Sequence, residues 1–341
     1  MFSLITGANG FIGSHLTHFL VQQKEQVRVL VRPQSDVRSL AGLPVEFAYG
    51  DLRDAASLFS AMRGVRRVYH VAADYRLWAK TPQEIYDNNV TGTRNLLAAA
   101  SQAGVERVVY TSSVATLVPP RPGVLPDENT HLHLKDMIGH YKRSKLLAEE
   151  EALAAARNGQ PVVIVNPTTP VGPGDWKPTP TGQVILDFLN GNMPAYVDTG
   201  LNFVAVEDVA KGHWLAAERG EVGARYILGD RNLTLKELLQ ILAALSGRPM
   251  PRLRLPHAIP LLAALVDSVA SRLLQRRPRI PLEGVRLARH RMFVDGSKAC
   301  RDLGFQPAPL EGALDRAIRW YSENGYLTAP LPLPPPSARA A

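Results

Sequence analysis

Short apolar runs recur along the first half of the chain, and stretches with helical periodicity separate them. The runs lie at residues 2–6, 27–32, 45–49, 68–72, 107–111 and 161–165. Most are nearly continuous in Val, Ile, Leu and aromatic residues, which is typical of parallel strands buried on both faces. The stretches between them, such as 88–104 and 141–156, have the apolar spacing of helices. The pattern predicts an α/β fold with a doubly wound parallel sheet.

The pattern changes after residue 165. Residues 166–182, NPTTPVGPGDWKPTPTG, are rich in Pro and Gly and predict a long functional loop. Residues 225–230 predict one further strand that returns to the sheet, and the rest of the second half has a mostly helical pattern. We therefore expect a first domain over 1–165, a smaller, mostly helical domain over 166–328, and a disordered proline-rich tail over 329–341.

The composition is ordinary for a folded protein: 341 residues, 45% hydrophobic and 21% charged. The single cysteine, Cys300, excludes an internal disulfide and a cysteine-based metal cluster, and it fits a reducing compartment. The sequence shows neither a leader with a basic start nor a run of 18 apolar residues. We therefore expect a cytoplasmic protein.

Positive charge is concentrated in one segment. The net charge is +8, and between Arg248 and Arg301 twelve Lys and Arg residues stand against three acidic ones, so the remainder is close to neutral. The segment also holds an apolar stretch from Ile259. A buried helix with a solvated basic flank is one interpretation, and a surface that meets anionic lipid or a phosphorylated substrate is the other. Nucleic acid is not expected, because no recognisable binding motif accompanies the charge.

Three glycines, Gly7, Gly10 and Gly13, follow the first apolar run at every third position and precede an amphipathic helix. Strand, GxxGxxG and helix in this order are typical of the first turn of a Rossmann-type dinucleotide-binding domain. We expect Gly7 to permit the tight turn, Gly10 to let the backbone approach a pyrophosphate, and Gly13 to let the helix pack closely on the strand. The helix N-terminus would then face the phosphates.

The end of the second predicted strand bears on which dinucleotide is bound. NAD-binding domains carry an acid there for the ribose 2′-hydroxyl, but this chain has Arg32, which suits a 2′-phosphate and could be assisted by Arg38. Asp51, after the third strand, could accept a hydrogen bond from the adenine amino group. The sequence predicts NADP, with NAD as the alternative because Arg32 could instead stack on adenine.

A tyrosine and a lysine four residues apart carry the candidate chemistry. Tyr141 and Lys145 share one face of a predicted helix, so the ammonium could lower the pKa of the phenol and let it exchange a proton near neutral pH. Ser113 follows the fifth strand, at the edge where open sheets bind ligands, and could polarise the same substrate oxygen. Helix capping is the alternative role for this serine.

With these motifs, the chain resembles the extended short-chain dehydrogenases/reductases over about residues 1–328. The resemblance rests on the glycine motif, GDL at 50–52, HVAA at 70–73, NVTGTRNLL at 89–97, TSS at 111–113, the Tyr141–Lys145 pair and NPTTPVGPGD at 166–175. HVAADYRLWA and the 166–182 loop are most similar to the hopanoid-associated sugar epimerases, which are close to dihydroflavonol-reductase-like enzymes. The resemblance implies a Rossmann cofactor domain and a smaller C-terminal substrate domain.

The resemblance also implies roles for individual residues. Ser113, Tyr141 and Lys145 would form the catalytic set, with Lys145 also on the nicotinamide ribose and Asn89 as a structural or proton-relay residue. Cofactor contacts would fall on Gly7, Gly10, Phe11, Ile12, Gly13, Arg32, Asp51, Leu52, Ala72, Tyr141, Lys145 and Pro167, and substrate contacts on Tyr75, Trp78 and Thr168. Core packing is the alternative for Tyr75 and Trp78.

Two features bear on the substrate. Sugar-nucleotide epimerases often carry an arginine near the substrate diphosphate, and Leu201 stands at that position here, so a polyol or a sugar joined to a lipid fits at least as well. His131, His133 and His140 crowd the loop before the catalytic tyrosine. We expect them to belong to a substrate loop and to hold no metal, because Asp136 alone is thin support for a metal site.

Three functions stay open on the sequence. An epimerase would oxidise and re-reduce one carbinol carbon of a sugar- or polyol-like substrate, whereas an NADPH-dependent ketone or aldehyde reductase would transfer the hydride once. A cofactor-binding regulator without turnover is the third, and the complete Ser–Tyr–Lys set argues against it. Peripheral contact with the inner face of the membrane and a homodimer stay open as well.

Overall fold

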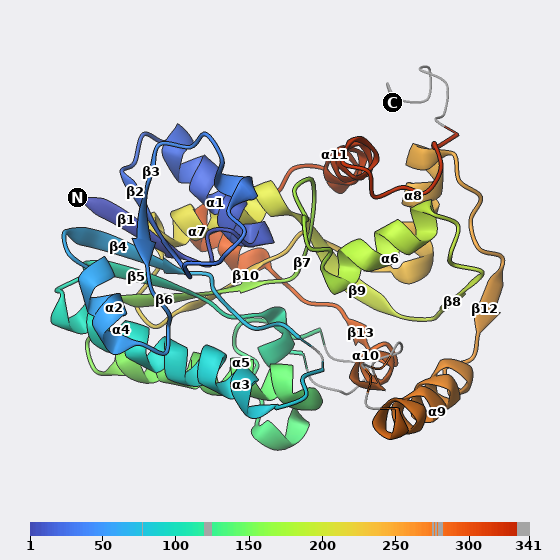
Figure 1. Cartoon of the computed structure of the whole chain (residues 1–341), viewed down its shortest axis with the longest axis horizontal. Coiled ribbons are helices and arrows are strands. Elements are labelled where there is room, and N and C mark those ends of the chain that lie inside the picture. The colour runs from blue at the N-terminus through green and yellow to red at the C-terminus, as the bar shows by residue number, and fades with distance from the viewer. Residues whose placement is uncertain (77, 119–124, 275, 277, 279–281, 333–341) are drawn as a thin grey trace.

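The computed structural model describes residues 1–76, 78–118, 125–274, 276, 278 and 282–332 (Figure 1). Its centre is a seven-stranded parallel sheet with the order β10-β6-β5-β4-β1-β2-β3. The strands are β1 (Phe2–Thr6), β2 (Val27–Val31), β3 (Val45–Tyr49), β4 (Val65–His70), β5 (Arg107–Thr111), β6 (Val162–Pro167) and β10 (Arg225–Leu228). The predicted doubly wound sheet is confirmed, including the strand that returns after a long excursion.

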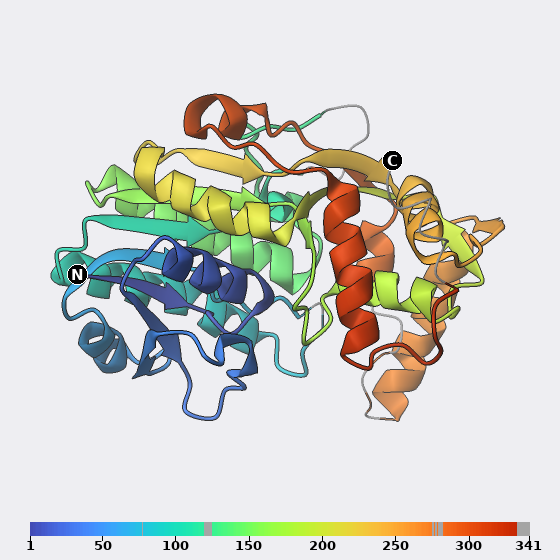
Figure 2. The ribbon, with the colours of Figure 1, turned by 90° about the horizontal axis from the view of Figure 1, so that it is seen from above.

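Helices cover both faces of this sheet, as Figures 1 and 2 show. On one face lie α1 (Phe11–Gln22) and α7 (Val206–Arg219), and on the other lie α2 (Ala55–Ala61), α4 (Gly92–Gln102) and α5 (Gly139–Arg157). Successive strand residues alternate between the two cores: Tyr69 and Val109 pack on the first side, and Val68 and Val108 on the second. The continuous apolar runs are therefore needed because both faces are buried. A short helix, α3 (Gln83–Tyr86), precedes α4.

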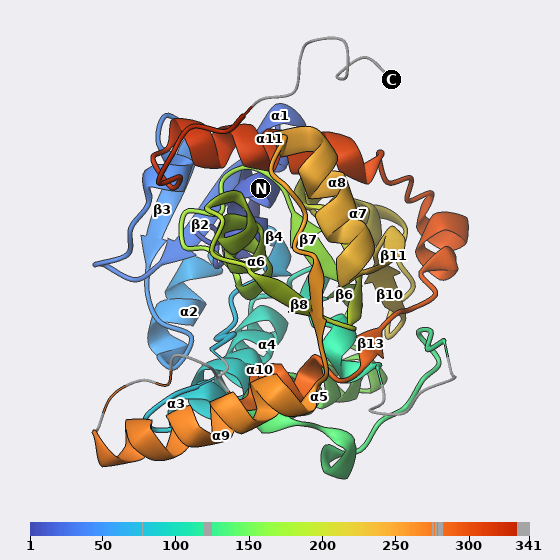
Figure 3. The same cartoon turned by 90° about the vertical axis from the view of Figure 1, so that its right-hand side faces the viewer.

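The C-terminal domain contains more β-structure than the sequence predicts. A four-stranded sheet pairs β9 (Gly200–Ala205) with β11 (Arg231–Thr234), β13 (Arg291–Met292) and β7 (Thr169–Val171), and β8 (Ala195–Val197) pairs with β12 (Leu253–Leu255). The helices are α6 (Pro180–Leu189), α8 (Leu235–Ser246), α9 (Ala258–Leu273), α10 (Leu282–Leu287) and α11 (Leu310–Glu323) (Figure 3). These strands are only two to six residues long, too short for a clear period in the sequence.

The predicted loop at 166–182 is partly regular. Strand β6 extends to Pro167, β7 follows directly, and α6 begins at Pro180 behind Thr179, whose hydroxyl accepts a hydrogen bond from the Gly182 N–H. The segment thus leads the chain from the first sheet to the second. Within the predicted tail at 329–341, Leu331 packs on the C-terminal core, and residues 333–341 lie outside the described residues.

The basic segment and the apolar helix within it differ from the first interpretation. Helix α9 is not buried: Leu262 is 64% exposed and Val266 is 63% exposed. Part of the positive charge is paired, because Arg254 and Arg291 both bind Asp198 and Arg276 binds Asp267. Within the described residues no helix has the length and apolar character needed to cross a bilayer.

Candidate active site

The glycine turn between β1 and α1 has the geometry that the sequence predicts. Gly7 has a φ of +71°, and a Cβ there would lie 2.7 Å from the Ala72 backbone. A Cβ at Gly13 would overlap the Gly7 carbonyl oxygen, so only glycine lets α1 approach β1 this closely. Gly10 caps α1 without any side-chain partner. The turn therefore leaves an uncovered helix N-terminus at Phe11 and Ile12, which fits a pyrophosphate.

The other predicted cofactor residues lie where neighbouring strands end. Ala72 follows β4, and its N–H donates to the Thr6 hydroxyl at the end of β1 (3.3 Å). Pro167 ends β6, and the Thr168 N–H donates to the Leu228 carbonyl at the end of β10 (3.1 Å). Because the strands are parallel, these residues share the carboxyl edge of the sheet, where open α/β sheets bind ligands.

The position after β2 holds an arginine whose charge contributes to the lowered pKa of the nearby Asp51. Arg32 is exposed, and in the described part of the chain its side chain forms no ion pair. Arg38 is already engaged, since it pairs with Asp36 (2.7 Å) and lies over the Trp176 ring at 5.2 Å. Arg32 is thus the cation at this end of the site that remains available for an anion.

Asp51 is less available than the sequence suggests. Its two carboxylate oxygens accept hydrogen bonds from the Arg53 guanidinium (2.9 Å each), and this pairing lowers the pKa of Asp51. The neighbouring Leu52 is held by its carbonyl, which accepts from the Asn95 amide (3.0 Å). An adenine amino group would have to share the Asp51 carboxylate with Arg53.

Ser113 and Tyr141 come together at the end of β5. Ser113 begins a 3₁₀ turn, Val114–Thr116, and its hydroxyl accepts from the Ala115 N–H (3.1 Å), so the capping role is present. Burial raises the pKa of Tyr141 above its usual value of 10, and the nearby Ser113 hydroxyl lowers it in part. The serine and the phenol therefore lie close together, and both hydroxyls can reach a single substrate oxygen.

Lys145 takes a different orientation from the predicted one. It is 2% exposed, and its ammonium donates to the Thr111 carbonyl (2.7 Å) and the Tyr110 hydroxyl (3.0 Å) rather than to Tyr141. Burial lowers the pKa of Lys145 to about 7, and the Glu149 carboxylate opposes that shift. Spacing places Tyr141 and Lys145 on one helix face, but the two partners at the end of β5 determine where the ammonium lies.

A buried carboxylate fixes the turn that carries Ser113. Glu149 on α5 accepts hydrogen bonds from Ser112, from Thr116 (2.9 Å) and from Asn166 (2.9 Å), and it pairs with Arg225 on β10 (3.3 Å). Four segments of the chain meet at this group. Sequence reasoning missed it, although a glutamate two helical turns after Tyr141, on the same face, was the available signal.

Asn89 has a structural role in this arrangement. Its amide donates to the Ser144 hydroxyl (2.9 Å) and the Asp74 carbonyl (2.9 Å), and its oxygen accepts from the Asp74 N–H (2.7 Å). It thereby links the segment after β4 to α5. Tyr75 and Trp78 on that segment are 41% and 39% exposed, so the core-packing alternative is wrong for both.

The histidines before Tyr141 do not form a ligand cluster. His140 contacts the Tyr86 hydroxyl (3.1 Å), and the His133 N–H donates to Asp136 (3.0 Å). Among the described residues no three His, Cys, Asp or Glu side chains are placed to hold a metal ion. Leu201 lies in β9 and packs against the C-terminal core, so its position offers a substrate no charge.

Comparisons of the chain with a family model, with curated relatives and with solved structures all point to one family. Residues 3–229 match the model of the NAD dependent epimerase/dehydratase family. The chain is 45% identical to a putative dihydroflavonol 4-reductase from Synechocystis, with 95% of each chain covered, and 39% identical to sterol demethylase protein B from Methylococcus capsulatus, with 96% of this chain and all of the relative covered. A nucleoside-diphosphate-sugar epimerase from Pseudomonas aeruginosa has a similar structure, with a TM-score of 0.79, 29% identity and 96% and 99% coverage.

Proposed function

Since the chain belongs to the NAD dependent epimerase/dehydratase family and is an NAD(P)-dependent oxidoreductase, we propose that it transfers a hydride between the nicotinamide ring and a carbinol or keto carbon of a polyol-, sugar- or lipid-like substrate. The observation that carries this proposal is the closeness of the Ser113 hydroxyl and the Tyr141 phenol at the carboxyl edge of the sheet, where Ser113 lowers the pKa of Tyr141. Two hydroxyls in this position can bind one oxygen of the substrate.

In this mechanism the two hydroxyls have separate tasks. Burial keeps Tyr141 protonated at neutral pH, so the phenol donates its proton to a carbonyl oxygen that becomes a hydroxyl. Ser113 donates a second hydrogen bond to that oxygen and orients it. The Lys145 amine, with a pKa near 7, lies on the same helix face and can exchange protons at the floor of the site. In the oxidative direction Tyr141 accepts the proton instead.

Replacing the phenol tests this mechanism directly. Tyr141→Phe should reduce kcat by about 10² to 10⁴-fold, because it removes the proton donor, while cofactor binding stays near the wild-type value. Tyr86→Phe, on the helix before α4, is the matched control because it removes a phenol that contacts His140 rather than Ser113. Full activity in Tyr141→Phe would show that another group transfers the proton.

We propose NADP as the preferred cofactor. The support is the exposed Arg32 after β2, which forms no salt bridge within the described residues and can bind a 2′-phosphate through charge-assisted hydrogen bonds. Arg38 contributes less, because Asp36 already neutralises it. Titration of both cofactors by protein fluorescence checks this: wild type should prefer NADP by about tenfold, and Arg32→Asp should lose or reverse the preference. A wild-type preference for NAD would contradict the assignment.

Net reduction is favoured over epimerisation. Leu201 gives no charge for a nucleotide diphosphate, and the relatives from Synechocystis and Methylococcus bear names of reductase and sterol-modifying proteins. Epimerisation is the second candidate, supported by the Pseudomonas neighbour. A panel of ketones and polyols, monitored for stoichiometric loss of NADPH absorbance, separates them, since an epimerase changes its substrate without net consumption of cofactor.

We also propose that α9 brings the enzyme to anionic lipid. Six large apolar side chains on and just after this helix are exposed: Ile259, Leu262, Leu265, Val266, Val269 and Leu274. They lie in the segment with the basic surplus, which is typical of peripheral membrane contact. Flotation should show salt-sensitive binding to anionic vesicles that Leu262→Asp abolishes. Equal binding to neutral vesicles, or none to either kind at low salt, would refute it.

A further inference from the structure

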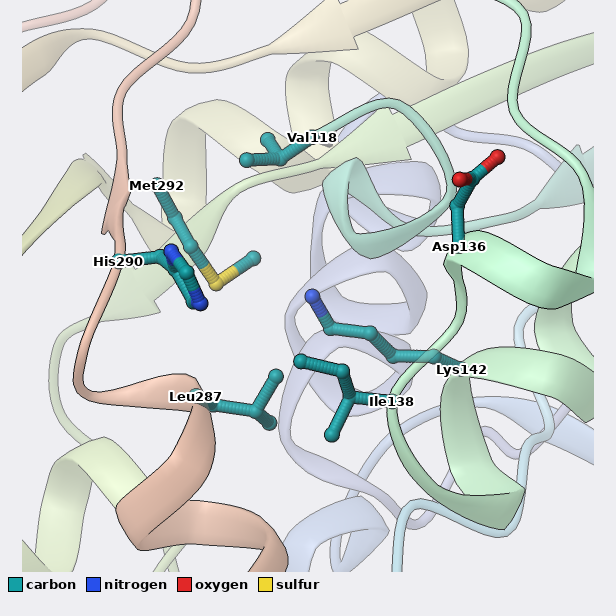
Figure 4. Close-up of a pocket in the computed structure, with 7 residues that line it drawn as sticks. All are labelled: Val118, Asp136, Ile138, Lys142, Leu287, His290 and Met292. Atoms are coloured by element: carbon teal, nitrogen blue, oxygen red, sulfur yellow. The ribbon is translucent and has the colours of Figure 1, made fainter. Parts of the chain in front are cut away.

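A small hollow opens between the start of α5, which carries Tyr141, and the C-terminal domain. Val118 and Ile138 line it from the first domain, and Leu287 and Met292 from the second (Figure 4). Two of its first-domain lining residues are close in sequence to the proposed catalytic residues, because Val118 follows the turn capped by Ser113 and Lys142 directly follows Tyr141 on α5. A ligand in this hollow would therefore contact residues that adjoin the proposed proton donor along the chain.

Lys142 is the one lysine among the described residues that line the hollow. Figure 4 shows its ammonium directed into the space below Val118 and beside Met292. The residue is 7% exposed, and in the described part of the chain its ammonium has neither a hydrogen-bond acceptor nor an ion-pair partner. The charged form of an amine on a largely buried side chain is poorly hydrated, and burial accordingly lowers the pKa of Lys142 to about 8.

Two other titratable groups face the hollow, and neither satisfies the amine. Asp136 accepts a hydrogen bond from the His133 N–H, and Figure 4 shows its carboxylate turned away from Lys142. Burial lowers the pKa of His290 below 6.5, with contributions from Arg289 and Lys142, so this imidazole is neutral at physiological pH. The hollow thus combines apolar walls, a neutral imidazole and one cation that lacks a counter-charge.

We propose that Lys142 binds an anionic oxygen group of the substrate, a carboxylate or a phosphate, and thereby selects substrates that carry such a group close to the reacting carbon. This inference rests on the proposed function for its connection to catalysis. A single cation suits one anionic group better than a diphosphate, which agrees with the apolar residue at Leu201. The bound anion would supply the partner that the amine lacks and would restore its full charge.

The test measures binding without turnover. Protein saturated with NADP⁺, so that the glycine turn is already filled, is titrated with acetate, with inorganic phosphate and with neutral acetamide at constant ionic strength. The ¹³Cε resonance of Lys142, assigned by its loss in Lys142→Met, reports the apparent pKa of the amine. We expect one of the two anions to raise that pKa by about one unit, a tenfold change in proton affinity, and acetamide to leave it unchanged. Whichever anion acts identifies the group as carboxylate or phosphate.

Two variants make the result specific. Lys135→Met removes an exposed lysine from the neighbouring turn and should bind the anion as wild type does, whereas Lys142→Met should bind it at least tenfold more weakly, measured by the rise in melting temperature. No pKa shift with either anion, or equal thermal shifts in Lys142→Met and wild type, would overturn the proposal. Tyr141→Phe keeps the two proposals apart: it should lose turnover and retain the anion response.

Discussion

Replacing Lys145 by Met should stabilise the protein near neutral pH while abolishing its activity. The folded state holds this ammonium at 2% exposure with a pKa of about 7, against the usual 10.5. Below pH 7 the chain must therefore keep a charge in a place where burial disfavours it. A methionine of similar length fills the space without that charge.

The magnitude follows from the two pKa values of Lys145. At about 1.4 kcal/mol per unit, the difference destabilises the folded state by about 4 kcal/mol at pH 7. The hydrogen bonds to Thr111 and Tyr110 would be lost in the variant, which offsets about 1–3 kcal/mol of the gain. We expect Lys145→Met to be more stable than wild type by about 1–3 kcal/mol at pH 7.

The dependence on pH has a definite sign. Between pH 7 and 10.5 the unfolded chain holds more protons at Lys145 than the folded chain, so stability rises with pH in this window. From pH 7 to 9 the gain from Lys145 is about 2 kcal/mol, and Lys142, with a pKa of about 8, adds about 1 kcal/mol. In Lys145→Met the free energy of unfolding should therefore rise less steeply with pH, because only the smaller contribution from Lys142 remains.

Urea unfolding of the cofactor-free protein at pH 7, 8 and 9 measures these values. Lys142→Met should flatten the slope by about half as much as Lys145→Met, and Lys135→Met, an exposed lysine, should leave it unchanged. Subtracting the wild-type slope from each variant's slope removes the contribution of the titratable groups that both proteins contain. A Lys145→Met protein that is less stable than wild type at pH 7, with an unchanged slope, would refute the reasoning.

Two further substitutions test the elements around the site. Gly13→Ala should lower the free energy of unfolding by about 1–3 kcal/mol and weaken cofactor binding in a fluorescence titration, because its Cβ overlaps the Gly7 carbonyl; wild-type affinity would contradict the close approach. Glu149→Gln should lower the free energy of unfolding in urea by about 3–5 kcal/mol, because it leaves the Arg225 charge buried and unpaired. A loss below about 1 kcal/mol would mean that the ion pair contributes little to stability.

The sheet could be predicted from the sequence because each of its strands is a run of apolar residues with both faces buried. For four predicted strands, β1, β2, β3 and β5, both ends lie within one residue of the ends in the structure. The C-terminal strands could not be predicted, because β7 contains Pro170 and β13 has only two residues. Their pairing with β9 depends on contacts between segments far apart in the chain, which local propensity does not contain.

The sequence could predict that the proposed catalytic residues gather at one edge of the sheet, but it could not predict the contacts between them. Helical spacing places Tyr141 and Lys145 on one face, yet it cannot show that Thr111 and Tyr110 hold the ammonium. Those acceptors come from the end of β5, about 35 residues earlier in the chain. The position of Ser113 near Tyr141 was predictable, because strand ends meet at one edge of the sheet.

The ion pair between Glu149 and Arg225 has a consequence for how the site forms as the chain is made. Arg225 lies 60 residues beyond the apparent end of the first domain, and its strand β10 pairs with β6 only after the chain has returned from the second sheet. A nascent or truncated chain that stops before β10 can form the glycine turn, but Glu149 would then be a buried carboxylate without its cation and the serine turn would lack its anchor. The nucleotide half and the catalytic half are thus separate in the order of synthesis, and the enzyme becomes competent for chemistry only when its last sheet strand is in place.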